Sequence, residues 1–237
     1  MTRFAGTFIA ALLLAACGGA AAVATPSPTP TVAATQAAAT TAPTATAAAT
    51  NAVSAGASIW TIGSASKAVV SVREQLVGVS LPNDAVLTAT GGAGAFTLKA
   101  DGTFSSDSKI SFDLTTLSSD SRDRDHFIKN DTLQTRQFPK AELVPTQTSD
   151  LALPLPSSGT FTFKLTGNLT IRGKTKEVSF DVVAKRNGAD LVATATLAPT
   201  VKFGDFGMTP PTSSFRVISI VDEIRLVVEV AATGAAA

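Results

Sequence analysis

The feature that most constrains this chain is an alternation of apolar and polar residues, which runs from residue 58 to about residue 232. In the stretch TFTFKLTGNLTIR, the side chains of Phe161, Phe163 and Leu165 alternate with threonine and lysine. Successive side chains of a β-strand point to opposite faces, so this period of two predicts a long strand with one buried face. The same pattern recurs in KEVSFDVV, DLVATATLA, EIRLVVEV, GAFTLKADG and KISFDL. Breaks rich in glycine, asparagine, aspartate and proline separate these stretches and predict turns.

The number and spacing of these strands predict an all-β fold. We count about eight candidate strands, several of them longer than the usual five or six residues. An antiparallel sandwich or barrel would accommodate them, and a barrel is favoured because closure removes exposed edges. We therefore expect an eight-stranded antiparallel barrel over residues 58–232. Such a barrel is just wide enough to be filled by side chains or to hold one small ligand.

One segment departs from the alternation. The stretch SSDSRDRDHFIKN has acidic residues early and Lys129 late, which predicts a short helix that begins near Ser121. Pro139 should end any helical structure and precede the next strand.

The first 17 residues are typical of a bacterial lipoprotein signal peptide. Arg3 is followed by an apolar run and then by Leu14-Ala15-Ala16-Cys17, which resembles a lipobox. Cys17 is the only cysteine in the chain and stands where lipidation would require it. We expect an extracytoplasmic protein anchored to the bacterial cell membrane through acyl chains on Cys17. A buried helix or a misassigned start is the alternative.

Residues 18–57 consist almost entirely of alanine, threonine, proline, serine and glycine, with no charged residue. Such a segment cannot bury enough apolar surface to fold, so we expect a disordered tether. We also expect a disordered tail over residues 233–237.

Charge and chemistry argue against several functions. Of 19 lysines and arginines only Arg3 precedes residue 58, which leaves 18 basic against 18 acidic residues in the folded part and predicts no nucleic-acid partner.

His126 is the only histidine, so a zinc site of the His and Cys type cannot be assembled. No Gly-x-Ser-x-Gly motif accompanies His126, and Gly173-Lys174-Thr175 lacks the upstream glycine of a phosphate-binding loop. We expect no catalytic residue, no metal and no cofactor.

The aromatic composition favours an apolar interior. The chain has 13 phenylalanines and no tyrosine, so an interior ligand would be mostly hydrocarbon. The side chains that we expect to line it are Phe112, Phe161, Phe163, Phe180 and Val182. A packed, phenylalanine-rich core has the same composition and is the alternative.

Six stretches, in this order, resemble the YceI-like family of secreted lipid-binding barrels. They are SIWTI at 58–62, Arg124-Asp125 in the charged helix, FPKAEL at 138–143, GNLTIRGKTKEVSFDV at 167–182, DFGM at 205–208 and VDEIRLVVEV at 221–230. The resemblance implies a lipocalin-like barrel with an elongated apolar interior that binds isoprenoid or similar amphiphilic lipid, and it implies no catalytic residue. Arg73-Glu74 departs from the family, whose common members have an apolar residue and often a histidine there.

The leading hypothesis is a membrane-tethered protein that sequesters or carries a long isoprenoid-type lipid, polyprenyl or quinone-like, inside its barrel. Arg124 would contact a charged head group near the helix, or would instead pair with a neighbouring acid. The competing hypothesis is a non-catalytic protein-interaction module of the cell envelope, with a filled core and exposed loops at 79–94 or 198–214. The sequence leaves a homodimer open.

Overall fold

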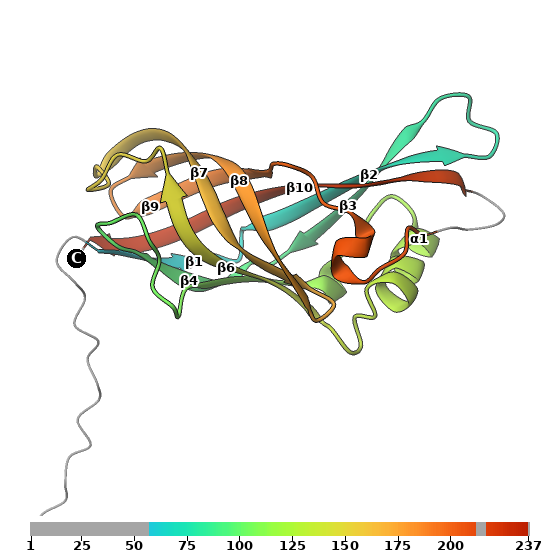
Figure 1. Cartoon of the computed structure of the whole chain (residues 1–237), viewed down its shortest axis with the longest axis horizontal. Helices are drawn as coiled ribbons and strands as arrows, with labels where there is room; N and C mark the ends of the chain where they lie inside the picture. The colour runs from blue at the N-terminus through green and yellow to red at the C-terminus, as the bar shows by residue number, and fades with distance from the viewer. Residues whose placement is uncertain (1–56, 212–216, 237) are drawn as a thin grey trace, which may run out of the picture. The chain divides into compact units, whose positions relative to one another are not determined.

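The structure is a computed structural model that describes residues 57–211 and 217–236. The expected signal peptide, Cys17 and nearly all of the expected tether lie outside these residues. Figure 1 shows the described part as strands wound about a common axis, with little helix. The first strand begins at Ser58, the residue at which the alternation starts.

Ten strands are present in the described residues, and every neighbouring pair is antiparallel. They are β1 (Ser58–Ile62), β2 (Lys67–Leu76), β3 (Asn83–Thr90), β4 (Ala93–Leu98), β5 (Lys109–Asp113), β6 (Lys140–Ser149), β7 (Ser158–Ile171), β8 (Lys174–Asn187), β9 (Asp190–Leu197) and β10 (Val217–Ala236).

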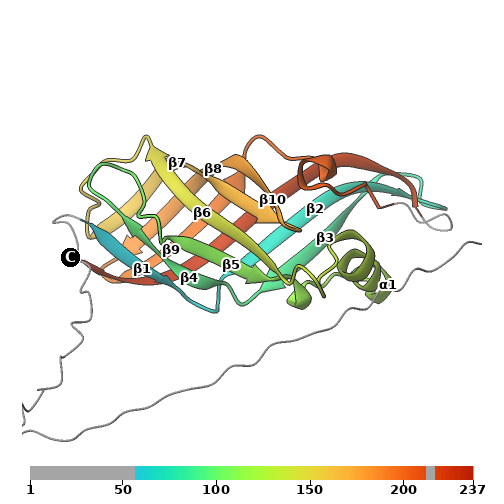
Figure 2. The same cartoon turned by 60° about the horizontal axis from the view of Figure 1, so that its bottom comes forward.

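Eight of these strands form a closed ring in the order β1-β4-β5-β6-β7-β8-β9-β10, because β10 also pairs with β1 (Figure 2). The predicted eight-stranded antiparallel barrel is therefore confirmed. The remaining two strands, β2 and β3, form a hairpin. The count of about eight strands from the sequence did not distinguish these two from the strands of the ring. This hairpin joins the sheet because β2 pairs with the first part of β10, from Val217 to Glu229.

The end of the chain corrects one expectation. Residues 233–236 belong to β10 and pair with β1, whereas the sequence predicted a disordered tail there. The stretch AATGAAA has no bulky apolar residue, so an alternation of apolar and polar residues cannot be recognised in it. Backbone hydrogen bonds to a neighbouring strand need no large side chain, and β1 and β9 supply them.

The hairpin of β7 and β8 matches the predicted alternation. Each strand has 14 residues, and a two-residue turn at Arg172-Gly173 joins them. Both turn residues have positive φ, 50° and 69°, as a type I′ turn requires. The inward faces carry the apolar residues, among them Leu169, Val178 and Phe180, which are all buried.

Four short helical segments lie between strands. They are η1 (Leu114–Thr116), α1 (Arg122–Phe127), the π-helical turn η2 (Ile128–Thr132) and η3 (Phe203–Phe206). Ser121 caps α1, since its hydroxyl accepts a hydrogen bond from the Arg124 N–H at 3.4 Å. The short helix predicted near Ser121 is confirmed, and β6 begins directly after Pro139.

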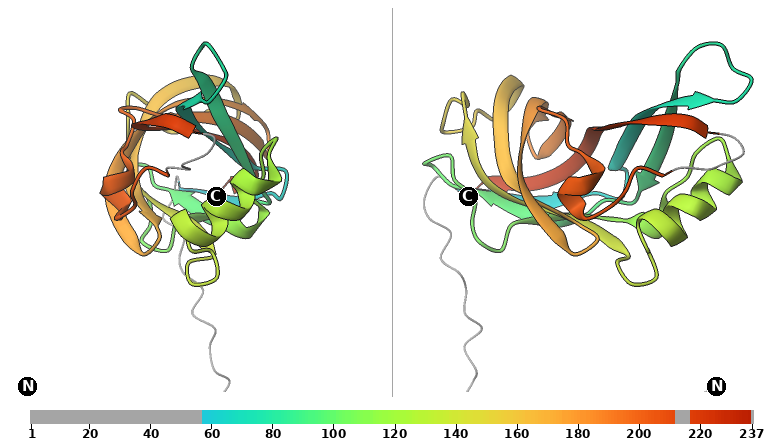
Figure 3. Two further views of the ribbon diagram at one scale, coloured as in Figure 1. Left: turned by 90° about the vertical axis from the view of Figure 1, so that its right-hand side faces the viewer. Right: turned by 45° about the vertical axis from the view of Figure 1, so that its right-hand side comes forward.

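The helix α1 lies at one end of the barrel, close to the hairpin of β2 and β3 (Figure 3). Thr88 on β3 forms an isolated bridge with Ser118, which fixes the segment that leads into α1. We call this end of the barrel the helix end. Of the helices in the described residues, none is long and apolar enough to span a membrane.

Candidate functional site

A cavity of about 820 Å³ lies inside the barrel at the helix end. A volume of this size falls within the range of small-molecule binding sites. Strands β2, β3, β5, β8 and β10 contribute to its wall, as do α1 and η3. Its lining is mostly apolar and includes Val72, Leu87, Phe112, Phe180, Phe203 and Met208.

These side chains point inward because apolar and polar residues alternate along the strands. They leave a space because several of the inward residues are alanines. Ala68 on β2, Ala85 and Ala89 on β3, and Ala195 on β9 are all buried and all line the cavity. An alanine side chain ends at Cβ, so these four positions cover the wall without filling the interior. The sequence prediction rested on phenylalanines and did not use this signal.

The opposite end of the barrel is packed much more closely. It retains a pocket of about 80 Å³, lined by Trp60 and Leu191 among others. The Trp60 ring is 1% exposed, and the guanidinium carbon of Arg186 lies 5.0 Å from its centroid. Arg186 donates to the carbonyls of Leu155 and Pro156 at 3.1 and 3.2 Å, which holds the loop before β7 over this end.

The structure divides the six residues expected at the binding site between these two spaces. Phe112, Phe180 and Arg124 line the large cavity. Phe161, Phe163 and Val182 line the small pocket at the other end. Ile110, Leu165, Ala195 and Val230 border both spaces, so the two spaces adjoin inside one barrel.

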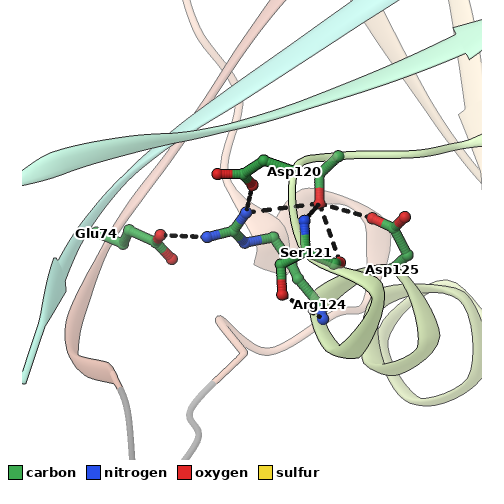
Figure 4. Close-up of polar contacts among 6 residues, drawn as sticks. Glu74, Asp120, Ser121, Arg124 and Asp125 are labelled. Carbon is green, nitrogen blue, oxygen red and sulfur yellow. Dashed lines mark hydrogen bonds and ion pairs between the residues drawn. The ribbon is translucent and has the colours of Figure 1, made fainter.

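A buried ion pair lies at the helix end of the large cavity (Figure 4). Nη2 of Arg124 on α1 is 2.7 Å from Oε1 of Glu74 on β2, with the two side chains 18% and 5% exposed. Nη1 of Arg124 also pairs with the carboxylate of Asp120. Arg124 therefore pairs with acids, as one of its two expected roles requires, and its contact with a head group stays a prediction.

Glu74 is the residue of this site that the sequence prediction missed. It follows Val70 and Val72 on the inward face of β2, at a position where the alternation calls for an apolar side chain. Its neighbour Arg73 points outward and pairs with Asp84 at 3.2 Å. Hydrogen bonds from Arg225 and then from Arg73 lower the pKa of the Asp84 carboxyl. The charge at Glu74 faces the cavity, whereas the charge at Arg73 faces water.

The described residues contain no group of three or more histidine, cysteine, aspartate or glutamate side chains that could hold a metal ion. His126 lies exposed on α1. Apart from the ion pair, the cavity offers mainly apolar contact, which suits the binding of an apolar molecule.

Comparison with known proteins identifies the fold and the family. The family profile described as the YceI-like domain matches residues 60–232. A protein of Pseudomonas putida strain F1 named UPF0312 protein is 32% identical over 133 residues, which are 51% of this chain and 66% of that protein. A protein of the same name from strain KT2440 matches to the same extent. The match thus spans just under two thirds of these relatives.

Two solved structures share the fold. A polyisoprenoid binding domain from Saccharophagus degradans, implicated in plant cell wall breakdown, superposes with a TM-score of 0.56 at 11% identity and covers 74% of this chain and 98% of that domain. BcnA of Burkholderia cenocepacia gives a TM-score of 0.52 at 18% identity, with 71% and 96% covered. The closed barrel and the match over residues 60–232 together show that the chain belongs to the YceI-like family.

Proposed function

We propose that this protein binds a long isoprenoid-type lipid, polyprenyl or quinone-like, inside its barrel and sequesters or carries it at a membrane. The observation that carries the proposal is the cavity of about 820 Å³ with its mainly apolar lining. Burial of apolar surface stabilises a complex by about 25 cal/mol per Å², so a hydrocarbon chain needs no specific polar contact to bind. The proposal involves no catalytic step.

Two further observations support this function. The inward alanines keep the interior open. The structure from Saccharophagus degradans is described as a polyisoprenoid binding domain and has the same fold. The tether and the acyl anchor on Cys17 belong to the proposal through the sequence of residues 1–57. They would hold the barrel near a membrane and raise the local concentration of a lipid ligand.

The competing function, a protein-interaction module with a filled core, requires a densely packed interior. The large cavity counts against it. Exposed apolar residues on the loop between β2 and β3, such as Val79 and Leu81, would be its contact surface.

A cavity-filling substitution tests the proposal. Ala85→Phe on β3 would place a ring in the large cavity, and we expect it to weaken binding of a radiolabelled C20 isoprenoid alcohol at least about tenfold, or about 1.4 kcal/mol. Val86→Phe is the matched control, because Val86 is the next residue on the same strand and is 45% exposed. The assay uses the full chain with Cys17→Ser, so that no acyl anchor competes for the site. Equal binding by the two variants, with both folded, would exclude the cavity as the binding site.

A further inference from the structure

Glu74 places a negative charge where an amphiphilic ligand would place its head group. The residue is 4% exposed, and its neighbours on the inward face, Val72 and Leu76, line the same cavity. Taking a carboxylate out of water is costly unless it is paired and hydrogen-bonded. A buried carboxylate on the wall of an apolar cavity therefore restricts which ligand the cavity can accept.

Arg124 is the only cationic residue that lines the cavity in the described part of the chain. Its guanidinium is already shared between two carboxylates, those of Glu74 and Asp120, and its Nη1 also lies 3.5 Å from the Ser119 hydroxyl. One positive charge thus meets two negative charges. Of these two carboxylates only that of Glu74 is buried, because the side chain of Asp120 is 80% exposed. Asp123, which borders the cavity, is also exposed. The carboxylate of Glu142 does not enter this balance, because it pairs with Lys109 at 3.1 Å.

This charge balance disfavours an anionic head group. Phosphate groups in proteins are bound by arginine forks and other cations that are free to face them. Here the single arginine is already paired with acids, and a phosphate inside the cavity would approach the buried carboxylate of Glu74. Like charges brought together in a site of low dielectric repel more strongly than in water.

The same carboxylate offers a contact to an uncharged donor. A carboxylate can accept about four hydrogen bonds. Among the described residues, Glu74 accepts one, from Nη2 of Arg124 to Oε1, and none reaches Oε2. A hydroxyl group at the end of an apolar chain could donate to Oε2 without bringing a charge into the cavity.

We propose that Glu74 sets the head-group specificity of the cavity, so that it takes isoprenoid lipids with an uncharged hydroxyl head and rejects their phosphate esters. The inference rests on the proposed function and specifies its ligand class. Glu74 acts in direct contact with the head group, and Arg124, which also pairs with Asp120, holds the Glu74 side chain in place.

The test compares two probes with the same C20 tail, geranylgeraniol and geranylgeranyl phosphate. Their dissociation constants are measured by competition against radiolabelled geranylgeraniol, with the full chain carrying Cys17→Ser. We expect the alcohol to bind at least about tenfold more tightly than the phosphate, or about 1.4 kcal/mol. Glu74→Gln keeps the size of the side chain, removes its charge and leaves Arg124 paired with Asp120 alone, so the ratio should fall to about one or reverse.

Glu229→Gln is the matched control. Glu229 lies on the outer face of β10, where it pairs with Lys67 at 3.1 Å, and its loss should leave the ratio unchanged. Should Glu74→Gln fail to fold because Arg124 has lost its buried partner, the double variant Glu74→Gln with Arg124→Gln removes both charges of the buried pair. It should lose the preference in the same way while still binding the alcohol.

The possible outcomes distinguish this inference from the proposed lipid-binding function on which it rests. Failure of both probes to bind the wild type would overturn the proposed function and the inference together. Equal binding of the two probes, or tighter binding of the phosphate, would overturn the inference and leave the lipid-binding function intact. A preference that persists in Glu74→Gln would show that another residue selects the head group.

Discussion

At the scale of single residues, Trp60 and Gly234 show how tightly one end of the barrel is packed. Trp60 lies on β1 and Gly234 faces it from β10, where the two strands pair at these positions. A Cβ added at Gly234 would lie 2.6 Å from Cδ2 of Trp60 and 2.7 Å from the carbonyl oxygen of Ile59. Both distances are shorter than van der Waals contact. A glycine at position 234 therefore allows β10 to close the ring against a tryptophan.

We expect Gly234→Ala to destabilise the barrel by about 1–3 kcal/mol, the usual cost of overpacking. Thermal unfolding followed by circular dichroism would measure this as a lower Tm. Gly204→Ala is the control, because a Cβ at Gly204 would have no atom within 4 Å and the residue has no positive φ. An equal Tm for the two variants would contradict the packing described here.

At the scale of elements, two of the stretches that resemble the family, 167–182 and 205–208, lie against each other. Lys176 on β8 pairs with Asp205 on η3 at 2.6 Å. Arg172, in the turn between β7 and β8, donates from Nη1 to the carbonyl of Gly207 at 2.7 Å. These contacts join the hairpin to the segment that carries Phe203 and Phe206, both buried. The sequence indicated both stretches but not that they meet.

Asp205 should make this contact depend on pH. Its pKa is lowered by the ion pair with Lys176 and by the hydrogen bond that it accepts from the Lys202 N–H at 2.8 Å. Because this pKa is lower in the folded state, the carboxylate stabilises the fold at pH values above its unfolded-state pKa, about 3.9. The stabilisation is lost as the pH falls through the folded-state pKa.

We therefore expect Asp205→Asn to reduce the free energy of unfolding at pH 7 by about 1 kcal/mol or less, as for a partly exposed ion pair. The difference from wild type should begin to shrink as the pH falls below about 4, and it should disappear below the lowered folded-state pKa of Asp205. Urea unfolding at pH 7 and at acidic pH measures this difference in the free energy of unfolding. Asp190→Asn is the control, since the side chain of Asp190 has no ion pair within the described ranges. A difference that is unchanged at low pH would show that charge is not the cause.

At the scale of the whole molecule, the proposal needs a membrane anchor in addition to a barrel. Growth of bacteria that express the full chain with a radiolabelled fatty acid should label the wild type. Cys17→Ser should abolish the label, because the chain contains no other cysteine to be lipidated. Thr44→Ser, in the expected tether, should keep it. An unlabelled wild type would contradict the lipoprotein interpretation without testing the binding function proposed for the barrel.

The sequence predicted the barrel well because alternation is a local signal that each strand carries by itself. It predicted the inward faces of β7 and β8, including Phe163 and Phe180, for the same reason. It could not predict that Phe161 and Phe163 lie in a different space from Phe112, because that depends on where Trp60 and Arg186 pack. The pairing of Glu74 with Arg124 joins residues 50 positions apart and needs the fold to be known.

The central claim is that the inward side chains of this barrel face a lipid rather than each other. Native mass spectrometry, combined with organic extraction, on the full chain with Cys17→Ser tests it most directly. The protein is purified from bacterial cells without detergent. We expect a stoichiometric bound mass whose fragments are isoprenoid. An unliganded mass that persists after incubation with polyprenyl and quinone lipids would contradict the account and favour the protein-interaction module.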